Sequence, residues 1–183
     1  MVPAHVTGLM RHFIDLRDGV HGDAVSRRDK EAVFAREVDL LSPVARQALS
    51  EVNMYLLLDS GTVSETGLER SADGGMSATW QLTWPEQQVV RVPPIMLHAF
   101  FGASFHHPHL RGATLGDWPL NVLSAQDATD QLPILRAIAT ADLHNLVFQA
   151  DYRIIPAVTR PPEVGPPTSS GIRSFDVGLE GGA

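Results

Sequence analysis

Three of the eight histidines of this 183-residue chain lie in the short segment 105–112, which reads Phe-His-His-Pro-His-Leu-Arg-Gly. Proline at position 108 disfavours the helical conformation for His107, so the segment is expected to be extended. In an extended chain, residues two apart project to the same side, about 7 Å apart along the backbone. His107 and His109 are therefore predicted to face one way, and His106 the other.

Two neutral imidazoles facing one way can bind a divalent ion such as zinc or iron, but a metal centre needs at least one more protein ligand. His98, on the preceding predicted strand, is the first candidate for that ligand. Later candidates are Asp117, His144 and Asp151. The predicted metal ligands are thus His98, His107 and His109.

The same segment also offers a chemistry that needs no metal. A histidine can act as general acid or base because its unperturbed pKa lies near neutrality. Asp117 or Asp142 would be its partner, and Arg111 would hold an anionic group of a substrate. The predicted catalytic residues are His107, His109, Arg111 and Asp117. A simpler interpretation stays open, in which these histidines are only hydrogen-bonding groups of a partly exposed loop.

No known motif assigns a function to the histidine segment or to the rest of the chain. The His-x-His spacing is similar to that of cupins, but cupins place a glutamate four or five residues later, where this chain has Ala113 and Thr114. Gly102–His106 lacks the last glycine of the Gly-x-Ser-x-Gly nucleophile elbow. The chain contains neither GxxxxGK[ST] nor GxGxxG, so no nucleotide-binding motif is present. Without a redox cofactor motif, the expected reaction is hydrolytic, lyase-like or isomerase-like.

Composition narrows the class of partner. The net charge is −7, with 21 acidic against 14 basic residues, and Lys30 is the only lysine. Nucleic acid and anionic membranes draw their affinity from clustered basic residues, so neither is an expected partner. Absence of cysteine excludes thiolate metal sites and cysteine nucleophiles. The start lacks the features of a signal peptide, and the longest apolar stretch, 92–105, is interrupted by prolines, so a cytoplasmic protein is expected.

The elements that would position the histidines begin with helices. The first 60 residues predict two or three of them, each with one apolar side. The first stripe consists of Leu9, Met10, Phe13, Ile14 and Leu16, and the second of Val33, Phe34, Val38 and Leu41. Ser26 and Asp29 have the spacing of a capping box at the start of the second helix. Ser42-Pro43 predicts an N-cap and a first-turn proline that restart a further helix.

Strands are predicted downstream. Val63–Arg70 and Ser77–Trp84 form a predicted hairpin, in which Ala78, Trp80, Leu82 and Trp84 alternate with polar residues. Ile95–Phe101 is a predicted central strand, Trp118–Leu123 a short one and Leu146–Ile155 the last. Between them, Ser124 and Asp127 predict a second capping box, and Pro133 predicts a helix start or a kink.

Together these elements predict an α+β fold. Its N-terminal helices pack on a mostly antiparallel, strongly curved sheet, and one later helix follows. Residues 1–156 are expected to form a single domain, and the Pro/Gly-rich residues 157–183 an extended tail docked on that domain or on a neighbouring subunit.

Two functions remain open. One is a small-molecule enzyme or ligand-binding domain with a histidine-lined pocket. The other is a non-catalytic accessory subunit whose tail holds together a homo-oligomer or a larger complex.

Overall fold

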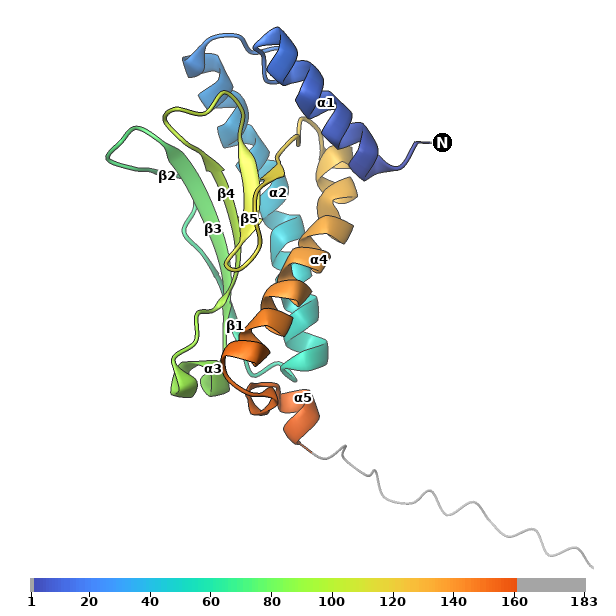
Figure 1. Cartoon of the computed structure of the whole chain (residues 1–183), viewed down its shortest axis with the longest axis vertical. Coiled ribbons are helices and arrows are strands. Elements are labelled where there is room, and N and C mark those ends of the chain that lie inside the picture. The colour runs from blue at the N-terminus through green and yellow to red at the C-terminus, as the bar shows by residue number, and fades with distance from the viewer. Residues whose placement is uncertain (1, 161–183) are drawn as a thin grey trace, which may run out of the picture.

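The computed structural model describes residues 2–160, and the predicted C-terminal tail from residue 161 onward lies outside the described residues (Figure 1). The helices are α1 (Ala4–Asp18), α2 (Arg27–Leu56), α3 (Pro85–Val90), α4 (Ala125–Gln149) and α5 (Pro156–Thr159), with a 3-10 turn at Tyr152–Ile154. The strands are β1 (Thr62–Glu65), β2 (Glu69–Arg70), β3 (Met76–Thr83), β4 (Ile95–Phe101), β5 (His109–Gly112) and β6 (Trp118–Pro119).

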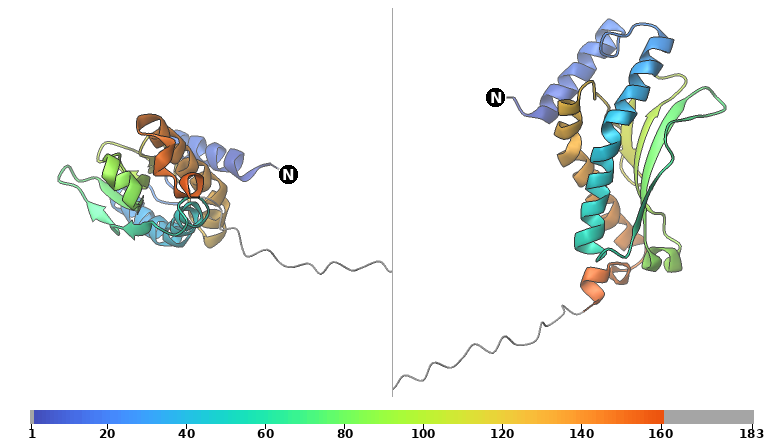
Figure 2. Two further views of the ribbon diagram at one scale, coloured as in Figure 1. Left: turned by 90° about the horizontal axis from the view of Figure 1, so that it is seen from below. Right: turned by 180° about the vertical axis from the view of Figure 1, so that it is seen from behind.

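The strands form one open antiparallel sheet in the order β1-β3-β4-β5-β6, with β2 also paired to β3. Helices α2 and α4 cover one face of it, which Figure 2 shows from behind. Trp80 lies opposite Leu97 and Ala78 opposite Ala99, and all four side chains are buried against the helices. The predicted α+β class and the predicted hairpin are therefore confirmed.

Helix α2 runs unbroken through Pro43, so the predicted restart at Ser42-Pro43 is wrong. A proline inside a helix removes a hydrogen bond and costs about 3 kcal/mol. Here the buried stripe continues on both sides of it, through Val38, Leu41 and Ala45, and burial of that stripe offsets the cost. Helix α4 passes through Pro133 in the same way, beginning at the predicted cap Ser124, whose Oγ accepts from the Asp127 amide.

The strand predicted at Leu146–Ile155 is also wrong. Leu146 instead closes the buried stripe of α4, which packs on β4 and β5, and the chain leaves the helix only after Gln149. The β-rich composition of this stretch misled the prediction. Its residue Phe148 belongs to no strand and lies exposed on the last turn of α4. The strand predicted at Trp118–Leu123 shortens to β6, and beyond it the Val122 amide donates to a side chain rather than to a strand.

Helix α1 exposes the apolar side that was expected to face the core, and it buries polar side chains instead. It lies across the ends of α2 and α4, away from α3 and α5 (Figure 1). Its apolar residues face outward, with Met10 and Phe13 each 54% exposed. Its buried side chains are instead polar, since His12 is only 7% exposed and Asp15 only 5%. The apolar stripe correctly predicted a helix, but hydrophobic burial is not what holds this helix in place.

No helix among residues 2–160 combines the length and the apolar run that crossing a bilayer requires.

Candidate metal centre

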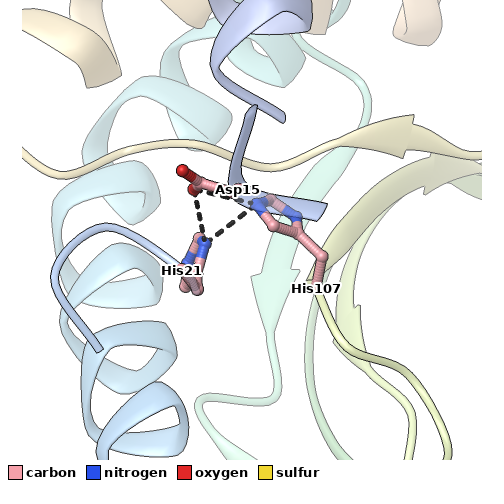
Figure 3. Close-up of side chains that lie close together, drawn as sticks. All are labelled: Asp15, His21 and His107. Carbon is pink, nitrogen blue, oxygen red and sulfur yellow. Dashed lines mark hydrogen bonds and ion pairs between the residues drawn. The ribbon is translucent and has the colours of Figure 1, made fainter. Parts of the chain in front are cut away.

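Three buried side chains from separate segments converge beneath α1: Asp15 of α1, His21 of the α1–α2 loop, and His107 of the β4–β5 loop (Figure 3). Nδ1 of His21 lies 2.9 Å from Nε2 of His107. Oδ2 of Asp15 lies 3.5 Å from that His107 nitrogen and 3.8 Å from the His21 nitrogen. Both histidines are fully buried. The three atoms thus form a small triangle closed to solvent.

The size of this triangle matches a metal coordination shell. Zinc binds nitrogen and oxygen ligands at about 2.0–2.2 Å in tetrahedral geometry, which separates neighbouring ligand atoms by about 3.3–3.6 Å. Of the observed separations, 3.5 Å lies within this range, 2.9 Å lies below it and 3.8 Å lies above it. All three atoms lie within 4.8 Å of one another, close enough for one ion to reach them.

The far nitrogen of each imidazole has a partner that orients the ring. Nε2 of His21 lies 2.8 Å from Oε2 of Glu37, a fully buried carboxyl group on α2. Nδ1 of His107 donates to the Pro108 carbonyl over 2.9 Å. Carboxylates and backbone carbonyls are the groups that orient metal-binding histidines in proteins. When Nε2 of His21 donates to an ionised Glu37, the inner nitrogens, Nδ1 of His21 and Nε2 of His107, are both lone-pair donors toward the centre.

Burial keeps both histidines neutral, which is the form that binds a metal. Burial is the main cause that lowers the pKa of His21 to about 4, and burial followed by the neighbouring His21 lowers that of His107 to about 4. Burial also raises the pKa of Glu37 well above its usual range. In the metal-free chain, a protonated Glu37 can therefore donate to His21, and His21 Nδ1–H to His107. A bound ion would take the place of that last proton, with the Glu37 proton then on Nε2 of His21 and Glu37 ionised.

Asn121 supplies a further oxygen next to the centre. Its Nδ2 donates to the Gly8 carbonyl of α1 over 3.1 Å, which fixes the orientation of the amide. Its Oδ1 is consequently directed at Nε2 of His107, 3.1 Å away. With His107 donating from Nδ1 to Pro108, its Nε2 is an acceptor, and it faces a carboxylate oxygen, an amide oxygen and Nδ1 of His21. A cation or a shared proton is the natural occupant of such a position.

Two glycines shape the loop that carries His21. Gly19 ends α1 in the left-handed conformation, at φ 70°, which suits glycine because it has no Cβ. Gly22, at φ 57°, donates its amide to Oδ2 of Asp15 over 3.2 Å. A Cβ at Gly22 would also lie 3.1 Å from the side chain of Leu123. The loop can therefore return directly to Asp15 and hold His21 in the same small space.

Two basic side chains at the start of α2 tie together the loops that carry His21 and His107. Buried Lys30 donates from Nζ to the Gly19 carbonyl at 2.8 Å and to the His106 carbonyl at 3.3 Å. Arg27 donates to three carbonyls around the start of the β4–β5 loop, those of Phe101, Gly102 and Phe105. These hydrogen bonds position two of the three converging residues from one helix.

Replacing Lys30 with methionine should destabilise the protein by about 1–3 kcal/mol, because two carbonyls lose a charged donor while the aliphatic stem stays in place. Arg28→Met is the matched control, since Arg28 is exposed two residues earlier on the same helix. Urea unfolding of both variants measures the effect. Equal stability of the two variants would show that Lys30 does not hold these loops.

The structure brings only some of the sequence-predicted site residues to this centre. His107 is part of it, and the His109 ring lies 6.2 Å from the His107 ring between centroids. His98 is on β4 and hydrogen-bonds to Thr79, and Arg111 lies over the Phe100 ring. Neither belongs to the group of three. Asp117 lines an apolar pocket beside α4.

Asp142, the other general-base partner considered from the sequence, has a different role. It is fully buried on α4 and accepts from the amides of Ala113 and Thr114 and from the Thr114 hydroxyl. These contacts fix the turn that follows β5. Asp142 is therefore a structural acceptor rather than a partner of a histidine.

Asp15, His21 and Glu37 were not predicted as site residues. Two signals for them exist in the sequence. His12 and Asp15 are one helical turn apart, so both face the same side. Glu37 falls within the apolar stripe of α2 that includes Phe34, Val38 and Leu41, where a carboxylate requires a buried partner. The position of His21 has no comparable local signal.

The chain matches no protein-family model, and neither a curated protein nor a solved structure is significantly similar to it. The geometry of the centre therefore carries the functional argument alone.

Proposed function

We propose that this protein binds a divalent transition-metal ion, zinc by preference, through Asp15, His21 and His107. The observation that carries the proposal is the convergence of their three donor atoms, each within 4.8 Å of the others and all buried. Nitrogen and carboxylate ligands suit zinc, whereas calcium and magnesium prefer all-oxygen shells. Asp15 and Glu37 together carry two negative charges when ionised, which balances the charge of the ion.

The ion would also supply what holds α1 to the domain. The buried side chains of α1 are His12 and Asp15, while most of its apolar side chains are exposed. A metal bound to Asp15 from α1 and to His21 and His107 from two loops joins three segments at one point. Binding free energy at such a centre stabilises the folded state directly. The proposed role of the ion is therefore to secure this end of the fold.

Titration of the metal-free full chain with zinc tests the proposal, with equilibrium dialysis and elemental analysis as readouts. One zinc per chain is expected, and Asp15→Ala and His21→Ala should each bind at least about 100-fold more weakly, since each removes a ligand. His144→Ala is the control, because His144 is exposed on α4. Wild-type protein that binds zinc no better than His21→Ala would overturn the proposal.

Glu37→Gln tests the group that orients His21. Both carboxyl oxygens of Glu37 are used, Oε1 by the Val122 amide at 2.8 Å and Oε2 by His21. Glutamine keeps only one acceptor, so zinc affinity should fall about 10–100-fold, as for other groups that orient a metal ligand. Glu51→Gln, at an exposed Arg136 ion pair, is the matched control. Isothermal titration calorimetry with zinc measures both, and an unchanged affinity for Glu37→Gln would exclude an orienting role.

A second candidate is a metal-dependent, non-redox enzyme that acts on a small polar molecule. A cavity of about 330 Å³ between α1 and α4 has Asn121 in its wall, and that residue contacts His107 on its other side. Its polar lining includes Arg11, Asp127 and Gln131. The volume is within the range of small-molecule sites. Hydrolysis or elimination would require the ion to keep an open coordination position next to this cavity.

A further inference from the structure

We infer that His12 is a fourth ligand of the proposed centre, which makes the ion a closed, structural one rather than a carrier of catalytic water. This inference rests on the proposed metal site and adds a residue outside the converging group of three. It also decides between the two candidate functions, because a catalytic ion needs a coordination position that no protein ligand fills.

The first observation is an orphaned buried nitrogen. His12 is 7% exposed, and its Nδ1 is buried without a hydrogen-bond partner among the described residues. A buried polar atom without a partner costs about 1–3 kcal/mol. Such atoms are rare in folded proteins, and a bound ion is one of the partners that account for them.

The second observation is position. His12 precedes Asp15 by three residues on α1, so both side chains leave the same side of the helix. The centroid of the His12 ring lies 4.3 Å from that of His107, in an edge-to-face arrangement. The His21 and His107 rings show nearly the same relation, with centroids 4.3 Å apart and planes at 80°. His107 is thus flanked by two imidazoles at the same distance between ring centroids.

The third observation is the number of side chains. His12 from α1 would add a fourth side chain to the three whose donor atoms converge, Asp15, His21 and His107. This number of ligands completes the tetrahedral shell that structural zinc sites adopt.

The consequence concerns how α1 is anchored. Two ligands one turn apart on the same helix would fix both the position of α1 along its axis and its rotation about that axis. This rotation keeps Met10 and Phe13 on the outside, where the structure places them. The helix would hold this orientation although none of its described residues belongs to the hydrophobic core.

X-ray absorption of the zinc-loaded full chain tests the inference by counting imidazole ligands. Three histidines are expected in the wild type and two in His12→Ala, with zinc affinity at least about 100-fold lower in the variant. Cobalt in place of zinc gives an independent readout, because the strong visible absorption of four-coordinate cobalt should weaken in His12→Ala. Met10→Ala is the control, an exposed position on the same helix.

The two proposals fail in different ways. A wild-type protein that binds zinc with only two histidines, and an affinity that His12→Ala leaves unchanged, would overturn the role of His12 and leave the centre itself intact. A wild-type protein that binds no zinc would overturn the centre. Metal-free unfolding of His12→Ala and of the wild type shows whether any loss of affinity merely reflects a damaged fold.

Discussion

Saturating zinc is expected to raise the midpoint of thermal unfolding of the metal-free chain by about 10 °C, and His107→Ala should abolish the rise. A ligand that binds only the folded state adds about 4 kcal/mol of stability at a thousand times its dissociation constant. For a chain of this length, each kcal/mol corresponds to about 2–4 °C. His107 is the sharpest test because its Nε2 contacts both other donor atoms, at 2.9 and 3.5 Å.

Differential scanning calorimetry after chelation, with and without added zinc, measures this effect. His144→Ala should keep the full rise in midpoint, since its exposed ring contacts Phe148 and Asn145 and lies outside the centre. Comparison of the metal-free midpoints separates loss of zinc binding from general damage. A His107→Ala protein that zinc stabilises as much as the wild type would refute the centre.

Asp142→Ala is expected to destabilise the protein by about 3–5 kcal/mol, whether or not zinc is present. The buried carboxyl group accepts from the Ala113 amide at 2.7 Å, the Thr114 amide at 2.9 Å and the Thr114 hydroxyl at 2.6 Å. Alanine leaves these donors without an acceptor inside the protein, and it also leaves a cavity. Urea unfolding gives the free energy difference directly.

Asp142→Asn provides the intermediate case for this prediction. Asparagine keeps the volume and one acceptor but directs an amide N–H₂ at a site lined with donors, so about half of the loss is expected. Asp130→Ala, at an exposed position on the same helix, should have little effect. If Asp142→Ala costs less than about 1 kcal/mol, the turn after β5 is not held by this residue.

The central strand β3 could be predicted from the sequence because buried apolar residues alternate along it with less buried polar ones. Alternation along 77–84 gave β3 with its buried residues in the right order. The two prolines misled the prediction of helix boundaries, since local chemistry opposes a helix at Pro43 and Pro133 whereas the buried stripes on either side favour it. The stripe on α1 predicted a helix, but periodicity alone does not reveal which side faces the core.

The candidate site could be predicted only in part, because its residues are far apart in the sequence. His21 and His107 touch although 86 positions separate them, and their contact depends on the loop at Gly19–Gly22 and on the carbonyls bound by Lys30. Spacing within 105–112 singled out His107, but no local pattern connects it to His21. Asp15 and Glu37 could have indicated the site from the sequence. Both are carboxylates within helices, at positions that fit poorly with an apolar interior.

Lys30 has a practical consequence for labelling chemistry. It is the only lysine in the sequence, and its amine is buried between two carbonyls. Amine-reactive dyes and cross-linkers should therefore leave the folded interior unmodified and reach this side chain only when the loops around it open. The rate at which a succinimidyl ester modifies Lys30, read by mass spectrometry, would therefore measure how fast this region opens in an otherwise native molecule.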